Sequence, residues 1–115
     1  EALSRATRSI TIICAGTAGE ISLDDALGAG IIAQEIQSLT PVTLKGDQAI
    51  LVSRAFKGLA DNDLATELKK AHHGQLVIDL GFEEDINFAA RRNSITAVAV
   101  RQDHYFVGVK GMSNE

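Results

Sequence analysis

The sequence predicts an α/β fold, with a mainly parallel sheet flanked by helices and an antiparallel hairpin at the C-terminal end. Residues 10–14, Ile-Thr-Ile-Ile-Cys, form a β-branched apolar run. Such a run is typical of a strand buried on both faces, as parallel strands are. Stretches with apolar residues at helical spacing follow it. A β-branched apolar run at 96–100 and an alternating segment at 104–110 lie near the C-terminal end, and the short turn between them fits an antiparallel pair.

Length and composition limit the classes of function. At 115 residues, the chain is expected to fold as a single α/β domain over 1–115, long enough to bury a sizeable core. Its net charge of −4 argues against a nucleic-acid partner, which needs clustered Lys and Arg. A single cysteine excludes an internal disulfide and favours a cytoplasmic protein. No apolar stretch has the length of a membrane span, so no membrane partner is expected.

A glycine loop and the start of a helix follow the strand expected at 10–14. Gly16 and Gly19 allow positive φ angles and the close approach of a ligand to the backbone. Ser22 is predicted to be the N-cap of the helix, with Asp25 in the reciprocal position of a capping box. Two interpretations remain open. In the first, the N–H groups of the loop and of the helix start bind a phosphate or sulfonate. In the second, the loop is only a tight connection, since its sequence matches neither G-x-G-x-x-G nor a P-loop.

The first two helices are predicted from apolar spacing and from their boundaries. A helix over residues 23–38 ends before the single proline, which disfavours helical backbone at the residue that precedes it. Gly28 and Gly30 each weaken this helix by about 1 kcal/mol relative to alanine. We therefore expect both glycines to pack closely against the sheet. A second helix is predicted over residues 48–57, with Asp47 as its N-cap.

Helical character continues through the middle of the chain. A helix over residues 64–72 is expected to end at the sequence His-His-Gly, residues 72–74, because cations favour the C-terminal end of the dipole and glycine suits the C′ position. Residues 75–80 are apolar and short, and periodicity leaves both strand and helix open. A further helix is predicted over residues 83–92, with an acidic first turn. Residues 1–8 have the composition of the tail of a helix.

Two adjacent carboxylates stand at the predicted start of the first helix. Asp24 and Asp25 are suited to ligate Mg²⁺, a hard cation that takes a few carboxylate oxygens together with water and substrate phosphate. The other interpretation is that they complement the helix dipole. Because successive helical residues point about 100° apart, we expect Asp25 to face the loop and Asp24 to face the metal or solvent.

Three more side chains are candidates for chemistry. Cys14 ends the predicted strand, where a thiolate beside a helix N-terminus is nucleophilic. No His lies near it in the sequence, however, so packing is its expected role. Arg91 and Arg92 are suited to bidentate binding of a sulfonate or phosphate, or they form the solvated end of a helix.

Two segments of the chain match the signatures of a known family, in the same order. Residues Ile13-Cys14-Ala15-Gly16-Thr17, Gly19, Ser22-Leu23-Asp24-Asp25 and Ala29-Gly30 resemble the core motif of the 2-phosphosulfolactate phosphatase (ComB) family. That motif runs approximately V-C-A-G-T-x-G-x-x-S-L-E-D, followed by A-G. The family's second signature is matched by His73-Gly74, Leu80-Gly81-Phe82 and Glu84-Asp85. The resemblance covers most of residues 9–107 and corresponds to the C-terminal half of a typical member.

The resemblance implies Mg²⁺-dependent hydrolysis of the phosphate ester of 2-phospho-3-sulfolactate, a step of coenzyme M biosynthesis. It implies Asp25 as a catalytic residue, Asp24 and Asp25 as ligands of Mg²⁺, and a helix over residues 75–80. Asp85 matches an acidic position of the second signature, as a site residue or as part of an acidic helix start. The substrate-binding roles fall on Gly16, Thr17, Gly19 and Arg91.

The resemblance also implies partners. We expect the N-terminal half of the same protein, with its further acidic, arginine and Asn-Gly-Thr motifs, to be needed for activity. We also expect a homo-oligomer, because a half exposes apolar surface that the other half covers. The chain departs from the family pattern at Gly28, where Cys is frequent, at Asn93, where Asp is usual, and at Val98-Ala99, where Val-Pro is common. The alternative function is a non-enzymatic α/β module that binds an anion or drives oligomerisation.

Overall fold

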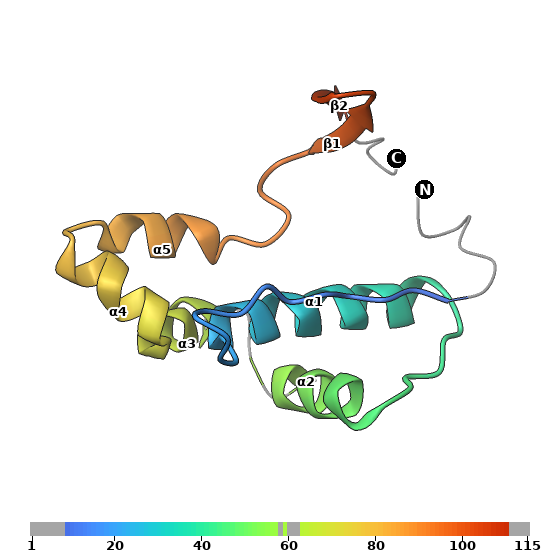
Figure 1. The fold of residues 1–115 in the computed structure, drawn as a ribbon, viewed down its shortest axis with the longest axis horizontal. Coiled ribbons are helices and arrows are strands. Elements are labelled where there is room, and N and C mark those ends of the chain that lie inside the picture. The colour runs from blue at the N-terminus through green and yellow to red at the C-terminus, as the bar shows by residue number, and fades with distance from the viewer. Residues whose placement is uncertain (1–8, 58, 60–62, 111–115) are drawn as a thin grey trace.

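The computed structural model describes residues 9–57, 59 and 63–110. Within these ranges it contains five helices and one two-stranded antiparallel sheet (Figure 1), namely α1 (Leu23–Leu39), α2 (Asp47–Lys57), α3 (Leu64–Lys70), α4 (His72–Asp79), α5 (Glu83–Ala89), β1 (Ala97–Gln102) and β2 (Tyr105–Lys110). The helix tail expected at residues 1–8 lies outside the described residues. None of the described helices is long and apolar enough to cross a membrane.

Helices α1 and α2 pack against each other and bury the centre of the core. Leu27 of α1, Phe56 of α2 and Leu64 of α3 form one buried cluster. Gly30 permits this contact, because a Cβ at that position would lie 2.7 Å from the Cβ of Phe56. The prediction that Gly30 packs against a sheet is therefore wrong. Gly30 packs against helix α2. Among the described residues, no atom beyond the neighbouring backbone of α1 lies within 4 Å of a Cβ at Gly28, so the close packing expected of Gly28 is not present there.

The boundaries of the first two helices agree closely with the sequence pattern. The predicted helices at 23–38 and 48–57 are confirmed as α1 and α2. Asp47 is the first residue of α2 rather than its cap. The carbonyl of Gly46 accepts the first bond of the helix, from the N–H of Ile50 at 3.2 Å, so Gly46 occupies the N-cap position.

The chain breaks between α3 and α4 one residue before the predicted end of the third helix. Ala71 is extended, with φ −60° and ψ 145°, and buried. The histidines expected to end α3 therefore begin α4. Gly74 allows the sharp turn, because a Cβ there would collide with the carbonyl oxygen of Leu68. The helix favoured for residues 75–80 is confirmed as the later part of α4, which ends at Asp79. The next predicted helix is confirmed as α5, which ends at Ala89, before the predicted residue 92.

The strand expected at residues 10–14 is not formed. These residues are extended without sheet pairing, and Ile13 is 88% exposed. The side chain of Cys14 is exposed too, so its expected packing role is wrong. A buried strand needs neighbours on both edges. Among the described residues the sheet is limited to β1 and β2, and no parallel pair is present there.

The antiparallel hairpin at the C-terminal end is confirmed. Ala97 pairs with Lys110 and Gln102 pairs with Tyr105, so both strands begin one residue later than predicted. Figure 1 shows the hairpin standing away from the helices at the end of an extended segment. All six residues of β1 are exposed. Apolar side chains such as Val98 and Phe106 are also exposed, so the hairpin has an apolar surface that no other described element covers. An isolated two-stranded sheet of this kind is marginally stable in water.

Candidate functional site

The glycine loop before α1 is a tight turn closed by two backbone hydrogen bonds. The N–H of Thr17 donates to the carbonyl of Glu20 at 3.1 Å, and the N–H of Glu20 donates to the carbonyl of Thr17 at 2.9 Å. The two residues between them, Ala18 and Gly19, have φ angles of 53° and 84°. Two successive positive φ angles define a type I′ turn. The sequence signal for this turn is the glycine at its second central position.

Gly16 connects this turn to the first turn of α1. Its φ is 71°, and a Cβ at this position would lie 2.6 Å from the carbonyl oxygen of Glu20. Its N–H donates to Oδ2 of Asp25 at 2.7 Å. Two of the N–H groups expected to hold an anion, those of Gly16 and Thr17, therefore donate to acceptors within the protein.

The start of α1 separates its two acidic side chains. Ser22 is at the N-cap, as predicted, and its carbonyl accepts from the N–H of Ala26 at 3.0 Å. The reciprocal capping box is wrong, because Asp25 binds the loop and the hydroxyl of Ser22 donates to Oδ1 of Asp24. Asp25 thus faces the loop, as expected, while Asp24 points to other partners. Their positions on the helix, about 100° apart, explain the divergence.

Asp24 faces His73 across the interface between α1 and α4. Oδ2 of Asp24 lies 3.6 Å from Nδ1 of His73, and the two side chains are 33% and 57% exposed. The hydrogen bond from Ser22 lowers the pKa of Asp24 from its usual value, and the positive charge available at His73 acts in the same direction more weakly. Asp24 is therefore anionic at neutral pH. The break at Ala71 places His73 in the first turn of α4, which brings it to Asp24.

A cavity of about 320 Å³ opens beside this pair. Its polar side chains come from three helices: Asp24 from α1, His73 from α4 and Asp85 from α5. Its remaining lining is Leu68, Gly74, Val77, Ile86 and Ala89. The cavity therefore combines two carboxylates and one imidazole with an apolar wall, in a volume that suits a small organic acid.

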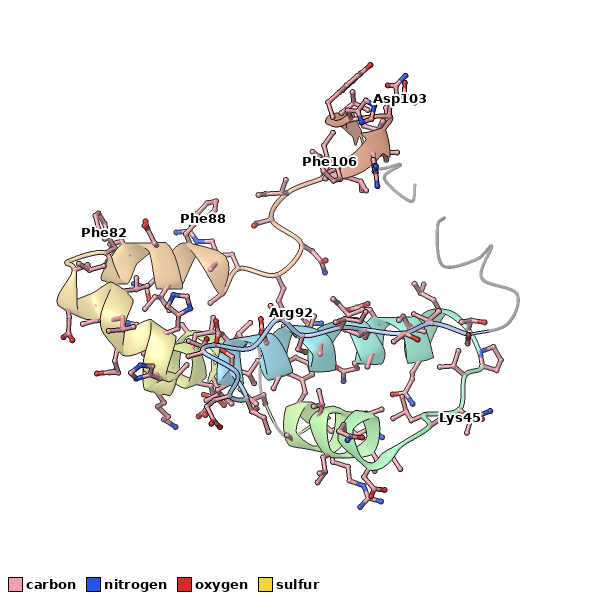
Figure 2. The ribbon with its side chains drawn as sticks, in the orientation of Figure 1. Lys45, Phe82, Phe88, Arg92, Asp103 and Phe106 are labelled. Carbon is pink, nitrogen blue, oxygen red and sulfur yellow. The ribbon has the colours of Figure 1, made fainter. Side chains whose placement is uncertain are left out.

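Arg91 lies apart from this cavity. Its guanidinium stacks over the ring of Phe88, 5.5 Å from the ring centroid. Phe82 and Phe88 project from the face of α5 that points away from α1 (Figure 2). Arg92, the neighbouring arginine, instead turns toward α1 and pairs with Glu35 at 2.7 Å. The structure thus gathers the loop residues and Asp25, and it does not bring Arg91 to them.

For two of the cavity residues, the sequence pattern by itself favours other roles. It predicts that His73 caps a helix end, because the break at Ala71 has no strong sequence signal. For Asp85 it leaves open a site role and an acidic helix start. Both residues stand in the second of the two matched signatures, and that position was the available signal for their proximity to Asp24.

The described residues do not form a complete metal centre. No group of three or more His, Cys, Asp or Glu side chains within them is arranged to hold a metal ion. Of the two predicted metal ligands, Asp24 lines the cavity, and Asp25 is engaged by Gly16. Only one of the two predicted ligands, Asp24, therefore lines the cavity.

Comparison with known proteins identifies sequence similarity to one family. The family model described as 2-phosphosulpholactate phosphatase matches residues 1–104. A probable 2-phosphosulfolactate phosphatase of Caldanaerobacter subterraneus is 34% identical over 86 residues, which cover 75% of this chain and 35% of that protein. The corresponding protein of Deinococcus radiodurans is 32% identical over 90 residues, or 78% of this chain and 36% of its own length.

A third relative extends the match over more of the chain. The probable 2-phosphosulfolactate phosphatase of Thermotoga maritima is 31% identical over 104 residues, covering 90% of this chain and 43% of that protein. The chain thus spans less than half the length of these curated relatives. No solved structure matches the chain.

Proposed function

Since the chain belongs to the 2-phosphosulfolactate phosphatase family, we propose that it is part of an enzyme that hydrolyses the phosphate ester of a small sulfonated hydroxy acid. The proposed substrate is 2-phospho-3-sulfolactate. In the reaction, a water oxygen attacks phosphorus, the ester P–O bond breaks, and the leaving alkoxide takes up a proton. The products are sulfolactate and inorganic phosphate, and the enzyme is returned unchanged.

The observation that supports a site for this chemistry is the cavity lined by Asp24, His73 and Asp85. A protonated imidazole donates from both ring nitrogens, so one N–H can pair with a carboxylate while the other donates to a phosphate or sulfonate oxygen. Because Asp24 lies near Nδ1 of His73, the other ring nitrogen, Nε2, is the one left to meet the substrate. We propose that His73 contacts the substrate and that Asp24 holds its ring in place.

The donor set of this cavity fits part of a magnesium site. Mg²⁺ is usually held by one or two carboxylates and completes its octahedral shell with water and substrate phosphate. Asp24 and Asp85 are the two carboxylates that line the cavity, and we propose that Asp24 is a ligand. When bound, Mg²⁺ neutralises charge on the phosphoryl oxygens. Without a cation, the two carboxylates repel an anionic substrate, so we propose that activity depends on Mg²⁺.

We also propose that the active protein is longer than this chain. Residues 10–14 expose isoleucines that are typical of a buried parallel strand, such as Ile13 at 88% exposure. The relatives have more than half of their length outside the matched region. In this proposal the other half supplies neighbouring strands of a mainly parallel sheet and completes the site, and the 115-residue chain alone shows little or no turnover.

Three further properties belong to the same proposal. The enzyme acts in the cytoplasm, serves coenzyme M biosynthesis, and forms a homo-oligomer. The last is supported by apolar side chains on the hairpin, where Val98 is 53% exposed and Phe106 is 72% exposed, because apolar surface of this kind drives association.

The exposed hairpin also favours the second candidate function, a non-enzymatic module that drives oligomerisation. Phosphate release separates the two functions. The protein, produced at the length of its relatives, is assayed with 2-phosphosulfolactate with and without Mg²⁺. We expect Mg²⁺-dependent release that falls at least about tenfold in Asp24→Asn. The control is Asp103→Asn, which removes one carboxylate from the hairpin turn, far from the cavity (Figure 2).

The outcome decides between the functions. Release that requires Mg²⁺ and Asp24 supports the phosphatase. Oligomer formation without any phosphate release, from a folded protein, supports the module. Equal activity of the Asp24→Asn and Asp103→Asn variants would show that the reaction takes place elsewhere.

A further inference from the structure

We propose that Asp25 is a positioning residue, whose carboxylate fastens the glycine loop to the first turn of α1. In this assignment Asp25 neither ligates the metal nor contacts the substrate. The inference departs from the role expected for Asp25 as a catalytic residue and metal ligand. Its consequence for activity rests on the proposed phosphatase function, whereas its structural part stands on the geometry of the loop.

The contact between Asp25 and the loop is short and charge-assisted. Oδ2 of Asp25 accepts the N–H of Gly16 at 2.7 Å, across nine residues of sequence, in a partly buried position. Hydrogen bonds to an ionised acceptor are about twice as strong as neutral ones. The backbone carbonyl of the same residue lies 3.6 Å from Sγ of Cys14. Asp25 therefore contacts the loop at Gly16 and the segment before it at Cys14.

The glycine loop has little conformational freedom of its own, even without the hydrogen bond to Asp25. The turn from Thr17 to Glu20 is closed by its own pair of hydrogen bonds. Gly16 has a positive φ and no room for a side chain, because Glu20 approaches it closely. One side chain that holds Gly16 consequently places the whole turn relative to α1.

The same contact argues against an anion at Gly16. An N–H that already donates to a carboxylate is not available to a phosphate, and the negative charge of Asp25 repels one. Asp24, one residue earlier, points to Ser22 and His73 and lines the cavity. The two carboxylates thus have different roles. Asp24 belongs to the site, and Asp25 holds the loop at the same end of α1.

Paired substitutions at Asp25 test this division. In the protein at the length of its relatives, Asp25→Asn retains a side-chain oxygen that accepts from Gly16, and Asp25→Ala does not. We expect Asp25→Asn to keep its Mg²⁺ affinity within about threefold, measured by calorimetry, and Asp25→Ala to lose about tenfold or more in kcat/KM. Asp24→Asn is the matched comparison and is expected to lose Mg²⁺ affinity.

Amide hydrogen exchange over residues 15–20 provides a readout independent of activity. We expect faster exchange in Asp25→Ala than in the unsubstituted protein and an intermediate or unchanged rate in Asp25→Asn. Unchanged exchange in Asp25→Ala overturns the proposal. Loss of Mg²⁺ affinity in Asp25→Asn with unchanged exchange also overturns it, because that result identifies a metal ligand. Absence of hydrolysis by the unsubstituted protein counts against the phosphatase, and the exchange data then decide the role of Asp25.

Discussion

The carboxylate of Asp24 is held from two directions, by the hydroxyl of Ser22 and by the imidazole of His73. The first contact is local, and the second joins two helices that are far apart in the sequence. Together they keep Asp24 anionic and orient His73 beside the cavity. The candidate site therefore consists of this interacting pair together with Asp85, and no group of three or more described residues is arranged to hold a metal ion.

The lowered pKa of Asp24 depends mainly on Ser22, and substitution of Ser22 tests this dependence. Because the Ser22 hydrogen bond is the largest cause of the lowered pKa, Ser22→Ala is expected to raise it. His73→Gln is expected to raise it less. Carboxyl carbon chemical shifts followed through a pH titration measure both effects. Ser38→Ala removes a hydroxyl elsewhere on α1, from a bond to the carbonyl of Glu35, and is expected to leave the pKa unchanged.

The same shift has a consequence for stability. A carboxyl with a lowered pKa in the folded state stabilises the protein above its unfolded pKa, and this contribution is lost as the pH falls through the folded pKa. We therefore expect Ser22→Ala to reduce the free energy of unfolding at pH 7, and the difference from the unsubstituted chain to shrink at pH 3. Urea unfolding at the two pH values measures it. An equal difference at both would contradict the assignment to Asp24.

Arg91 and Arg92 are adjacent, but their surroundings differ, so we expect their substitution by alanine to have different effects on stability. Arg92 pairs with Glu35 of α1 and lies 5.6 Å from the ring centroid of Phe56 in α2. Arg92→Ala is expected to lower the free energy of unfolding by about 1 kcal/mol or more. Arg91→Ala, at an exposed position, is expected to change it by less than about 0.5 kcal/mol. Equal losses in denaturant unfolding would remove the structural distinction between them.

At the scale of elements, α1 organises the described part of the chain. Its first turn holds the loop and faces the cavity, and its middle packs on α2 through Gly30. α3, α4 and α5 complete the cavity as three short helices with tight connections. The break at Ala71 is the most important of these connections, because a continuous helix there would not place His73 opposite Asp24.

Two glycines of α1 give a matched pair of substitutions. Gly30→Ala places a Cβ 2.7 Å from the Cβ of Phe56 and is expected to cost about 1–3 kcal/mol through overpacking. Gly28→Ala adds a methyl group into open space and is expected to stabilise α1 by up to about 1 kcal/mol. Chemical denaturation of both variants measures the difference. A stabilising Gly30→Ala would show that the two helices are not packed as described.

At the scale of the whole molecule, the described chain leaves apolar segments without neighbours. Residues 10–14 and the hairpin of β1 and β2 both expose branched apolar side chains. Both are also extended segments with backbone groups free to pair with further strands. These features are what a longer protein or a second copy would cover.

Hydrogen exchange tests the proposed strand at this scale. In the 115-residue chain, we expect the amides of residues 10–14 to exchange without protection, because they have no sheet partners. In the protein produced at the length of its relatives, we expect them to be among the protected amides, as those of a central strand are. The amides of α1 residues 30–36 provide an internal reference for folding. Equal exchange of residues 10–14 at both lengths would contradict the proposed sheet.

The sequence by itself determined the positions of α1, α2, α5 and the hairpin, because helical spacing, caps and β-branched runs act over a few neighbouring residues. It also determined that Asp24 and Asp25 diverge, since helix geometry separates adjacent side chains. Only the tertiary structure decided that Gly30 meets Phe56, that the chain breaks at Ala71, and that His73 and Asp85 join Asp24 at one cavity. Those contacts depend on packing between distant segments. The same dependence explains why the apolar run at residues 10–14 forms no strand here: a strand is stabilised by its neighbours, and local sequence does not supply them.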